Sequence, residues 1–237
     1  MIISHSQQFI FIANRKTASR AIGITFSSAC NKSDVITPLG KDESIRRELA
    51  YVAPRNFIPL RNIPSYLFLR LQRKLYGRKI SKELKRIGFH THITPAQILN
   101  YLPHKYWNLY FKFCFVRNPW DLVISQYFWA TRDKPDPISL DAYLNSSKIE
   151  GIAKRSRNMY TINDSLAVNR LCLYENSQAE VNQIFEELSL PGEPKLPNTK
   201  RQFRSDHRHY RDVLNDNQAD KIAKIFEKEI ELAGHSY

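Results

Sequence analysis

The stretch FKFCFVRNPWDLVISQY, residues 111–127, decides the fold. Its first part, FKFCFV, is apolar and rich in aromatic and β-branched residues, which is typical of a strand buried on both faces of a sheet. Asn118-Pro119 ends the strand, because the residue before proline avoids helical geometry while proline suits the first turn of a helix. Apolar residues at helical spacing then predict a helix over about 120–130. Arg117 is therefore expected between a strand end and a helix start, where anions bind.

A second unit of the same kind lies near the beginning of the chain. FIFIA, residues 9–13, predicts a short strand, and a helix over 21–29 follows the polar turn NRKTASR. Backbone N–H groups in such a turn, together with lysine and hydroxyl groups, can cradle a phosphate or sulfate. Two strand-turn-helix units predict an α/β fold in three layers, with a mainly parallel central sheet flanked by helices. The candidate anion-binding residues of the turn are Arg15, Lys16, Thr17, Ala18, Ser19 and Arg20.

The two motifs resemble those of sulfotransferases that use 3′-phosphoadenosine 5′-phosphosulfate (PAPS), in particular the carbohydrate and bacterial branch. FIANRKTASRAI is similar to the 5′-phosphosulfate loop I-P-K-T-x-G-T-S, with Ser19 in place of glycine and Arg20-Ala21 in place of threonine-serine. FKFCFVRNPWDLVISQY is similar to the 3′-phosphate motif F-V-R-x-P-x-x-R-x-x-S-x-Y. The resemblance extends over residues 8–237 and implies the P-loop-like sulfotransferase fold.

The resemblance also implies roles for individual residues. It implies that Arg117 and Ser125 hold the 3′-phosphate and that Lys16 contacts the 5′-phosphosulfate and stabilises the leaving oxygen. LPNTKR, residues 196–201, resembles the loop that closes over the nucleotide, so Lys200 and Arg201 are expected near the 3′-phosphate or the adenine. The late strand over 169–174 ends in Tyr-Glu-Asn, and the role of Glu175 is expected to be structural.

A candidate general base lies in GFHTHI, residues 88–93. Thr94 and Gln97 form a capping pattern with proline between them, which predicts a helix from 95 to about 102 and leaves His92 in the turn before it. A neutral imidazole can take a proton from an acceptor hydroxyl near pH 7. The resemblance implies that His92 has this role, with His90 the second candidate and a structural histidine the alternative. A zinc site is not expected, because cysteine or histidine partners do not follow at ligand spacing.

Composition and net charge limit the classes of protein to which the chain can belong. The 237 residues predict a single domain, 1–237, and the net charge of +13 favours anionic partners. Three cysteines without paired spacing indicate reduced core residues, and the sequence contains neither a signal peptide nor an apolar run long enough to span a membrane. These features, together with the resemblance, predict a bacterial cytoplasmic enzyme.

The segment 61–86 contains nine lysines and arginines and one glutamate, interleaved with large apolar residues. Three interpretations stay open: an amphipathic helix packed on the core, a wall that contacts an acidic acceptor, and attachment to a membrane surface. Elsewhere the chain predicts irregular cover over 31–63, a basic loop over 154–158 and a closing helix over 216–233.

The predicted function is transfer of a sulfuryl group from PAPS to a hydroxyl, less often an amine, of a glycan, glycoconjugate or small molecule, without metal or nucleic acid. Two rival functions remain. A P-loop phosphotransferase would need G-x-x-x-x-G-K-[ST], but only Lys16-Thr17 fits, and Ile10 and Arg15 occupy the glycine positions. A non-catalytic basic binder of anionic glycan or nucleic acid would explain the net charge.

Overall fold

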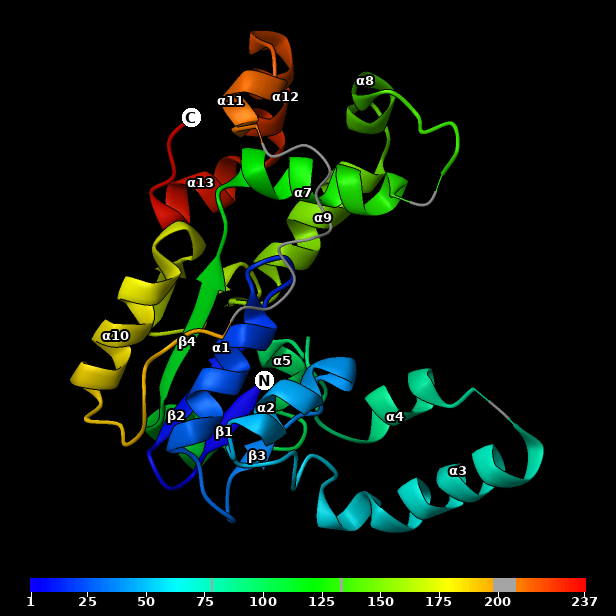
Figure 1. Ribbon diagram of the computed structural model, residues 1–237, viewed down its shortest axis with the longest axis vertical. Coiled ribbons are helices and arrows are strands. Elements are labelled where there is room, and N and C mark those ends of the chain that lie inside the picture. The colour runs from blue at the N-terminus through cyan, green and yellow to red at the C-terminus, as the bar shows by residue number, and fades with distance from the viewer. Residues whose placement is uncertain (78, 133, 198–207) are drawn as a thin grey trace.

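A five-stranded mixed sheet forms the centre of the molecule (Figure 1). The computed structural model describes residues 1–77, 79–132, 134–197 and 208–237. The strand order is β3-β1-β2-β4-β7, and a separate hairpin joins two further strands. The strands are β1 (Ile2–Ser4), β2 (Phe9–Ile12), β3 (Val35–Ile36), β4 (Phe111–Val116), β5 (Thr161–Ile162), β6 (Ser165–Leu166) and β7 (Arg170–Leu173).

The prediction of a mainly parallel sheet is wrong for one half of it. β2 pairs in parallel with β4, and β4 with β7, but β1 pairs antiparallel with both β2 and β3. Only residues 5–8 separate β1 from β2, and so short a connection can join only antiparallel strands. In the parallel half, the C-terminal ends of β2 and β4 lie at the same edge of the sheet, which brings the two predicted motifs together.

Helices cover both faces of this sheet, so the predicted α/β class is confirmed (Figure 1). They are α1 (Ser19–Phe26), α2 (Glu43–Glu48), α3 (Ile63–Tyr76), α4 (Ser81–Ile87), α5 (Pro95–Ile98), α6 (His104–Leu109), α7 (Pro119–Thr131), α8 (Leu140–Leu144), α9 (Lys148–Arg157), α10 (Ser177–Glu187), α11 (Tyr210–Val213), α12 (Asp216–Ile225) and α13 (Glu227–Ala233). Short 3-10 turns lie at Ser27–Ala29, Gly40–Asp42, Leu60–Asn62 and Tyr174–Asn176.

The alternation of side chains along β2 explains the layers. Phe9 and Phe11 belong to a buried cluster that includes residues of α1 and α10. Ile10 and Ile12 belong to another cluster, with residues of α5 and α6. Successive residues of a strand point to opposite faces, so both faces of β2 are buried. A third cluster joins α7, α8, α9 and α12 beyond the edge of the sheet where the two motifs lie.

Several local predictions are corrected. The basic segment 154–158, predicted as a loop, is the end of α9 and the residue that follows it. The predicted closing helix 216–233 is divided at Phe226 into α12 and α13, and the helix predicted from 95 to about 102 ends at Ile98. The segment 61–86 forms α3 and α4, and none of the α3 side chains is fully buried.

No helix in the described part of the chain has both the length and the apolar character that crossing a membrane requires.

Candidate functional site

The turn after β2 has the backbone geometry of an anion-binding loop. Lys16 has a φ of 63° and Ala18 a φ of 49°, whereas Thr17 between them is not left-handed. Such alternation turns successive N–H groups toward one side, and α1 then adds the positive end of its dipole. Within the described residues, the amide groups of 16–19 donate no hydrogen bond to the protein. As far as the described residues go, these donors are therefore available for an anion.

Arg117 connects this turn to the second motif. Its Nη1 lies 2.8 Å from the carbonyl oxygen of Lys16 and 3.2 Å from Oγ of Ser125. Its Nε and Nη2 bind Oδ2 of Asp121 at 2.8 Å and 2.7 Å, which fixes the plane of the guanidinium. The ring of Tyr174 lies 4.5 Å from the guanidinium carbon. The structure thus brings Arg117 and Ser125 into contact at the predicted spacing and places both beside the first motif.

The side chain of Lys16 adds positive charge to the same place. Burial, together with the smaller effects of the nearby charges of Arg117 and Arg132, lowers its pKa to about 8. Its Nζ lies 4.9 Å from the centre of a ring of Trp129, on α7, and the guanidinium of Arg132 stacks 3.9 Å from the ring of the same tryptophan. Because the charges of Arg117 and Arg132 contribute to this lowered pKa, an anion bound beside Lys16 would favour its charged form.

His92 is positioned by the end of β2. Its Nδ1 lies 2.7 Å from the carbonyl oxygen of Ala13. Because a carbonyl oxygen only accepts hydrogen bonds, Nδ1 carries the proton and Nε2 keeps its lone pair. Burial lowers the pKa of His92 to about 4, against a smaller raising effect of the Ala13 carbonyl. His92 is therefore neutral at pH 7, which is the protonation state that a general base needs.

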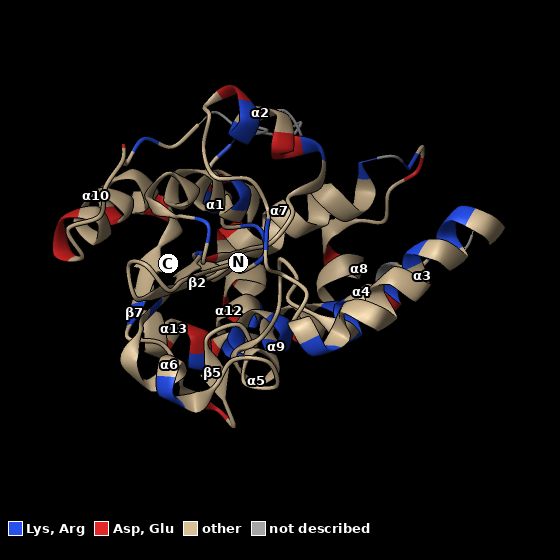
Figure 2. Ribbon diagram, turned by 90° about the horizontal axis from the view of Figure 1, so that it is seen from below, with Lys and Arg blue, Asp and Glu red and all other residues tan. Residues whose placement is uncertain are grey.

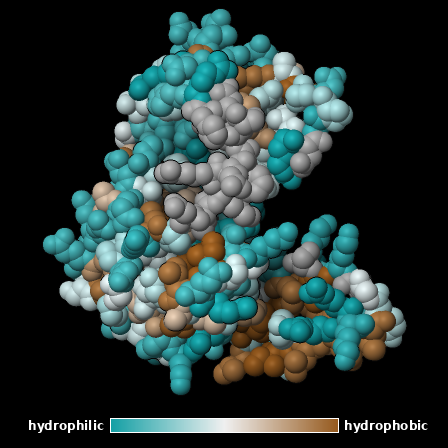
Figure 3. Space-filling model, in the orientation of Figure 1, coloured by the Kyte–Doolittle hydropathy of each residue, from teal (hydrophilic) through white to brown (hydrophobic). Residues whose placement is uncertain are grey.

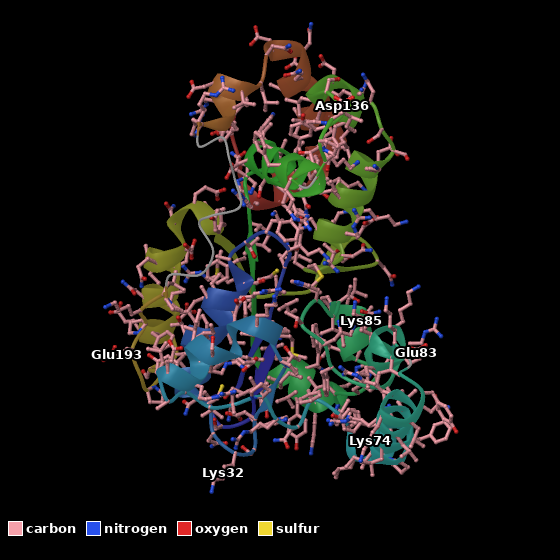
Figure 4. All side chains as sticks on the ribbon, turned by 45° about the vertical axis from the view of Figure 1, so that its right-hand side comes forward. Lys32, Lys74, Glu83, Lys85, Asp136 and Glu193 are labelled. Carbon is pink, nitrogen blue, oxygen red and sulfur yellow. The ribbon has the colours of Figure 1, made fainter. Side chains whose placement is uncertain are left out.

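A cavity of about 420 Å³ opens beside His92. Its basic wall includes Lys85 on α4, which is labelled in Figure 4. Among the described residues that line it, five are lysine or arginine and none is acidic. The lining residues are Arg15, Lys82, Lys85, Arg86, His90, His92, Thr94, Gln97, Arg155, Asn158 and Met159. The cavity therefore suits a negatively charged molecule.

The other predicted residues of the first motif have different surroundings. The hydroxyl of Thr17 donates to the carbonyl of Asn14 at 3.2 Å, and Ser19 is buried at the start of α1. Arg20 forms an ion pair of 2.7 Å with Asp42, so this guanidinium connects α1 to the 3-10 turn Gly40–Asp42 that precedes α2. Arg15 faces the cavity of His92. Lys200 and Arg201 lie outside the described residues.

Two residues of this site, Trp129 and Arg132, are missing from the sequence-based prediction. Trp129 follows Ser125 by four residues on α7, and Arg132, the C-cap residue just after α7, follows it by seven; this spacing places both on the side of the helix that carries Ser125. The helical periodicity, applied beyond the motif, would have identified them. Glu175 accepts the Asn118 N–H at 2.7 Å and thereby holds the turn that precedes α7, which agrees with its expected structural role.

Comparison of the chain with protein families, with curated proteins and with solved structures gives no significant match. Within the described residues, histidine, cysteine, aspartate and glutamate form no group of three that could hold a metal ion.

Proposed function

We propose that the protein has the P-loop-like sulfotransferase fold and transfers a sulfuryl group from PAPS to an acceptor hydroxyl. The observation that carries the proposal is the position of Arg117, which donates hydrogen bonds to Ser125 and to the carbonyl of Lys16. Two anion-binding elements are thereby held side by side. A ligand with anionic groups at two ends, as PAPS has, matches this arrangement.

The chain's own residues fit such a donor. The Lys16 side chain and the amide groups of residues 16–19 suit the 5′-phosphosulfate, and Arg117 with Ser125 suits the 3′-phosphate. When bound, PAPS would supply the sulfuryl group, with a new bond from the acceptor oxygen to sulfur as the bond from sulfur to the phosphate oxygen breaks. Lys16 stabilises the negative charge that this phosphate oxygen gains, because an ammonium group in a partly buried site acts strongly on nearby charge.

The acceptor is proposed to bind in the cavity beside His92. The Nε2 lone pair takes the proton that the acceptor hydroxyl loses, and the Ala13 carbonyl keeps the imidazole in the required tautomer. The five lysines and arginines of the cavity favour an acceptor that carries negative charge near its hydroxyl, such as an acidic glycan. His92 connects the acceptor site to the donor site, because it lines the cavity and its Nδ1 donates a hydrogen bond to Ala13, the residue after β2.

Calorimetric titration with 3′-phosphoadenosine 5′-phosphate tests the donor site. Binding is expected to require the 3′-phosphate, so adenosine monophosphate and ATP should bind more weakly. Ser125→Ala leaves the bonds of Arg117 to Asp121 and Lys16 in place, and loss of one hydroxyl donor is expected to weaken binding about fivefold to tenfold. Arg117→Ala should abolish detectable binding.

Arg55→Ala is the matched control, since it also removes one arginine, but one whose backbone bridges to Ile36 on β3, two strands away from β2 in the sheet. Equal affinity for all three nucleotides, or an equal effect of both arginine substitutions, would contradict the proposal. Steeply salt-dependent binding to any polyanion would then favour the basic binder. Magnesium-dependent ATP hydrolysis would favour the phosphotransferase.

A further inference from the structure

Most large apolar side chains of helix α3 are exposed, whereas a helix that packs on a core buries its apolar face. Leu67 is 60% exposed, Phe68 60%, Leu71 51% and Leu75 60%. With Pro64 they follow the spacing i, i+3, i+4, i+7 and i+11, which places them on one face of the helix. Figure 3 shows brown surface gathered at the lower right, where Figure 1 places α3. Exposed apolar faces of this kind mark interaction surfaces.

The opposite face of α3 is the one that holds it to the protein. Tyr66, Leu69 and Gln72 are half-buried, and α3 packs on α4. Just before the helix, the side-chain amide of Asn62 donates to the carbonyl of Ile87 at 2.7 Å. The orientation of α3 is therefore fixed by its contacts with the segment that leads into the cavity, and its apolar face is presented outward.

The charged residues around the apolar face indicate which kind of partner it binds. Arg70 and Lys74 lie beside the face by helical position. Arg61 precedes the helix in a 3-10 turn, where its guanidinium donates to the carbonyl of Asn100. Residues 49–82 contain no aspartate or glutamate, and Figure 2 shows lysine and arginine along α3 and α4. The basic residues of this segment are Arg55, Arg61, Arg70, Arg73, Lys74, Arg78, Lys79 and Lys82.

From this combination we infer that α3 binds the surface of an anionic lipid bilayer, with its apolar face in the headgroup region and its basic residues on the lipid charges. A helix with an apolar stripe bordered by lysine and arginine is suited to lie in that interface. With 14 residues α3 is too short to span a bilayer, which takes about 20 residues. A second copy is a poor partner, because two such faces would bring basic residues together without acidic partners.

Vesicle sedimentation tests the inference without reference to enzymatic activity. The protein is expected to sediment with vesicles of phosphatidylcholine mixed with phosphatidylglycerol, and much less with vesicles of phosphatidylcholine alone. Leu67→Ser/Leu71→Ser is expected to weaken binding at least about tenfold, because two exposed leucines no longer leave water on binding. Leu109→Ser is the matched control, since Leu109 is also an exposed leucine at 65% but lies on α6.

A site-specific probe makes the test independent of the double variant. The native cysteines Cys30, Cys114 and Cys172 are all buried, so an environment-sensitive dye can be directed to Leu71→Cys or, as control, to Leu109→Cys. On mixed vesicles the dye emission is expected to shift to the blue at position 71 only. A shift at neither position, or the same shift at both, would overturn the inference. So would a lipid-free dimer that the double serine variant dissociates, because the face would then be covered by a second copy.

Discussion

The pKa of His92 predicts how the stability of the protein depends on pH. In the folded protein burial lowers this pKa from the ordinary value of 6.5 to about 4. At this site the unfolded chain therefore binds more protons than the folded chain between these two values, and the contribution of His92 to stability falls as the pH is lowered through this window. Above pH 6.5 both states hold a neutral imidazole, and the stabilisation is fully present.

The size of the effect follows from the same two values. A pKa that falls from 6.5 to about 4 corresponds to about 3 kcal/mol of unfolding free energy at 1.36 kcal/mol per unit. Between pH 7 and about pH 4.5, the free energy of unfolding should lose about 2 kcal/mol of this contribution. For a chain of 237 residues this is equivalent to a change of about 4–8 °C in the melting temperature.

His92→Gln isolates this contribution, because glutamine can still donate a hydrogen bond to the Ala13 carbonyl but does not titrate. Thermal unfolding is measured at both pH values for the wild type and the variant, and the variant is expected to lose about 2 kcal/mol less on acidification. His104→Gln, at an exposed histidine of α6, should behave like the wild type. The same acid destabilisation in His92→Gln and wild type would refute a buried, neutral His92.

Three further predictions concern the site and its support. If His92 is the base, His92→Ala should lower turnover by about 10²-fold or more with nucleotide affinity nearly unchanged, and steady-state kinetics with nucleotide titration checks both. Because the pKa of Lys16 is lowered to about 8, affinity for the sulfated nucleotide should fall as the pH rises through that value, and Lys16→Met should remove this dependence in calorimetry. In Gly88→Ala the new Cβ would lie 2.5 Å from the backbone oxygen of Phe57. The free energy of unfolding, measured by denaturant titration, should therefore fall by about 1–3 kcal/mol. An unchanged free energy of unfolding would mean that this contact relaxes freely.

The parts of the fold that local sequence determines were predictable. β4 and α7 agree with the prediction because an apolar run, a proline and a capping asparagine act within a few residues of one another, and Asn118 accepts from the N–H groups of Trp120 and Asp121. The same holds for the start of α5, where Thr94 and Gln97 form the predicted capping box. Such interactions form within one turn of the chain and do not depend on tertiary context.

The parts that depend on contacts between distant segments were not predictable. β1 has only three residues, Ile2–Ser4, and its strand character comes from pairing with β2 and β3 on either side. The bond of Arg117 to the Lys16 carbonyl joins residues 101 positions apart, and the sequence alone indicates neither residue's partner. The periodicity of α3 predicts that this helix has an apolar face. It does not predict whether that face points toward the core or toward solvent, which depends on the contacts of α3 with α4 and its neighbours.

The contact between Arg117 and the Lys16 carbonyl sets the spacing of the two proposed anion-binding elements in the protein without ligand. The entropy needed to order the two turns is then part of folding, so a ligand of the right length does not have to supply it on binding. Preorganisation of this kind selects by length, since a ligand whose charged groups are closer together or farther apart can engage only one element at a time. A change in the parallel register of β2 against β4 would therefore weaken recognition of both ends of the ligand together.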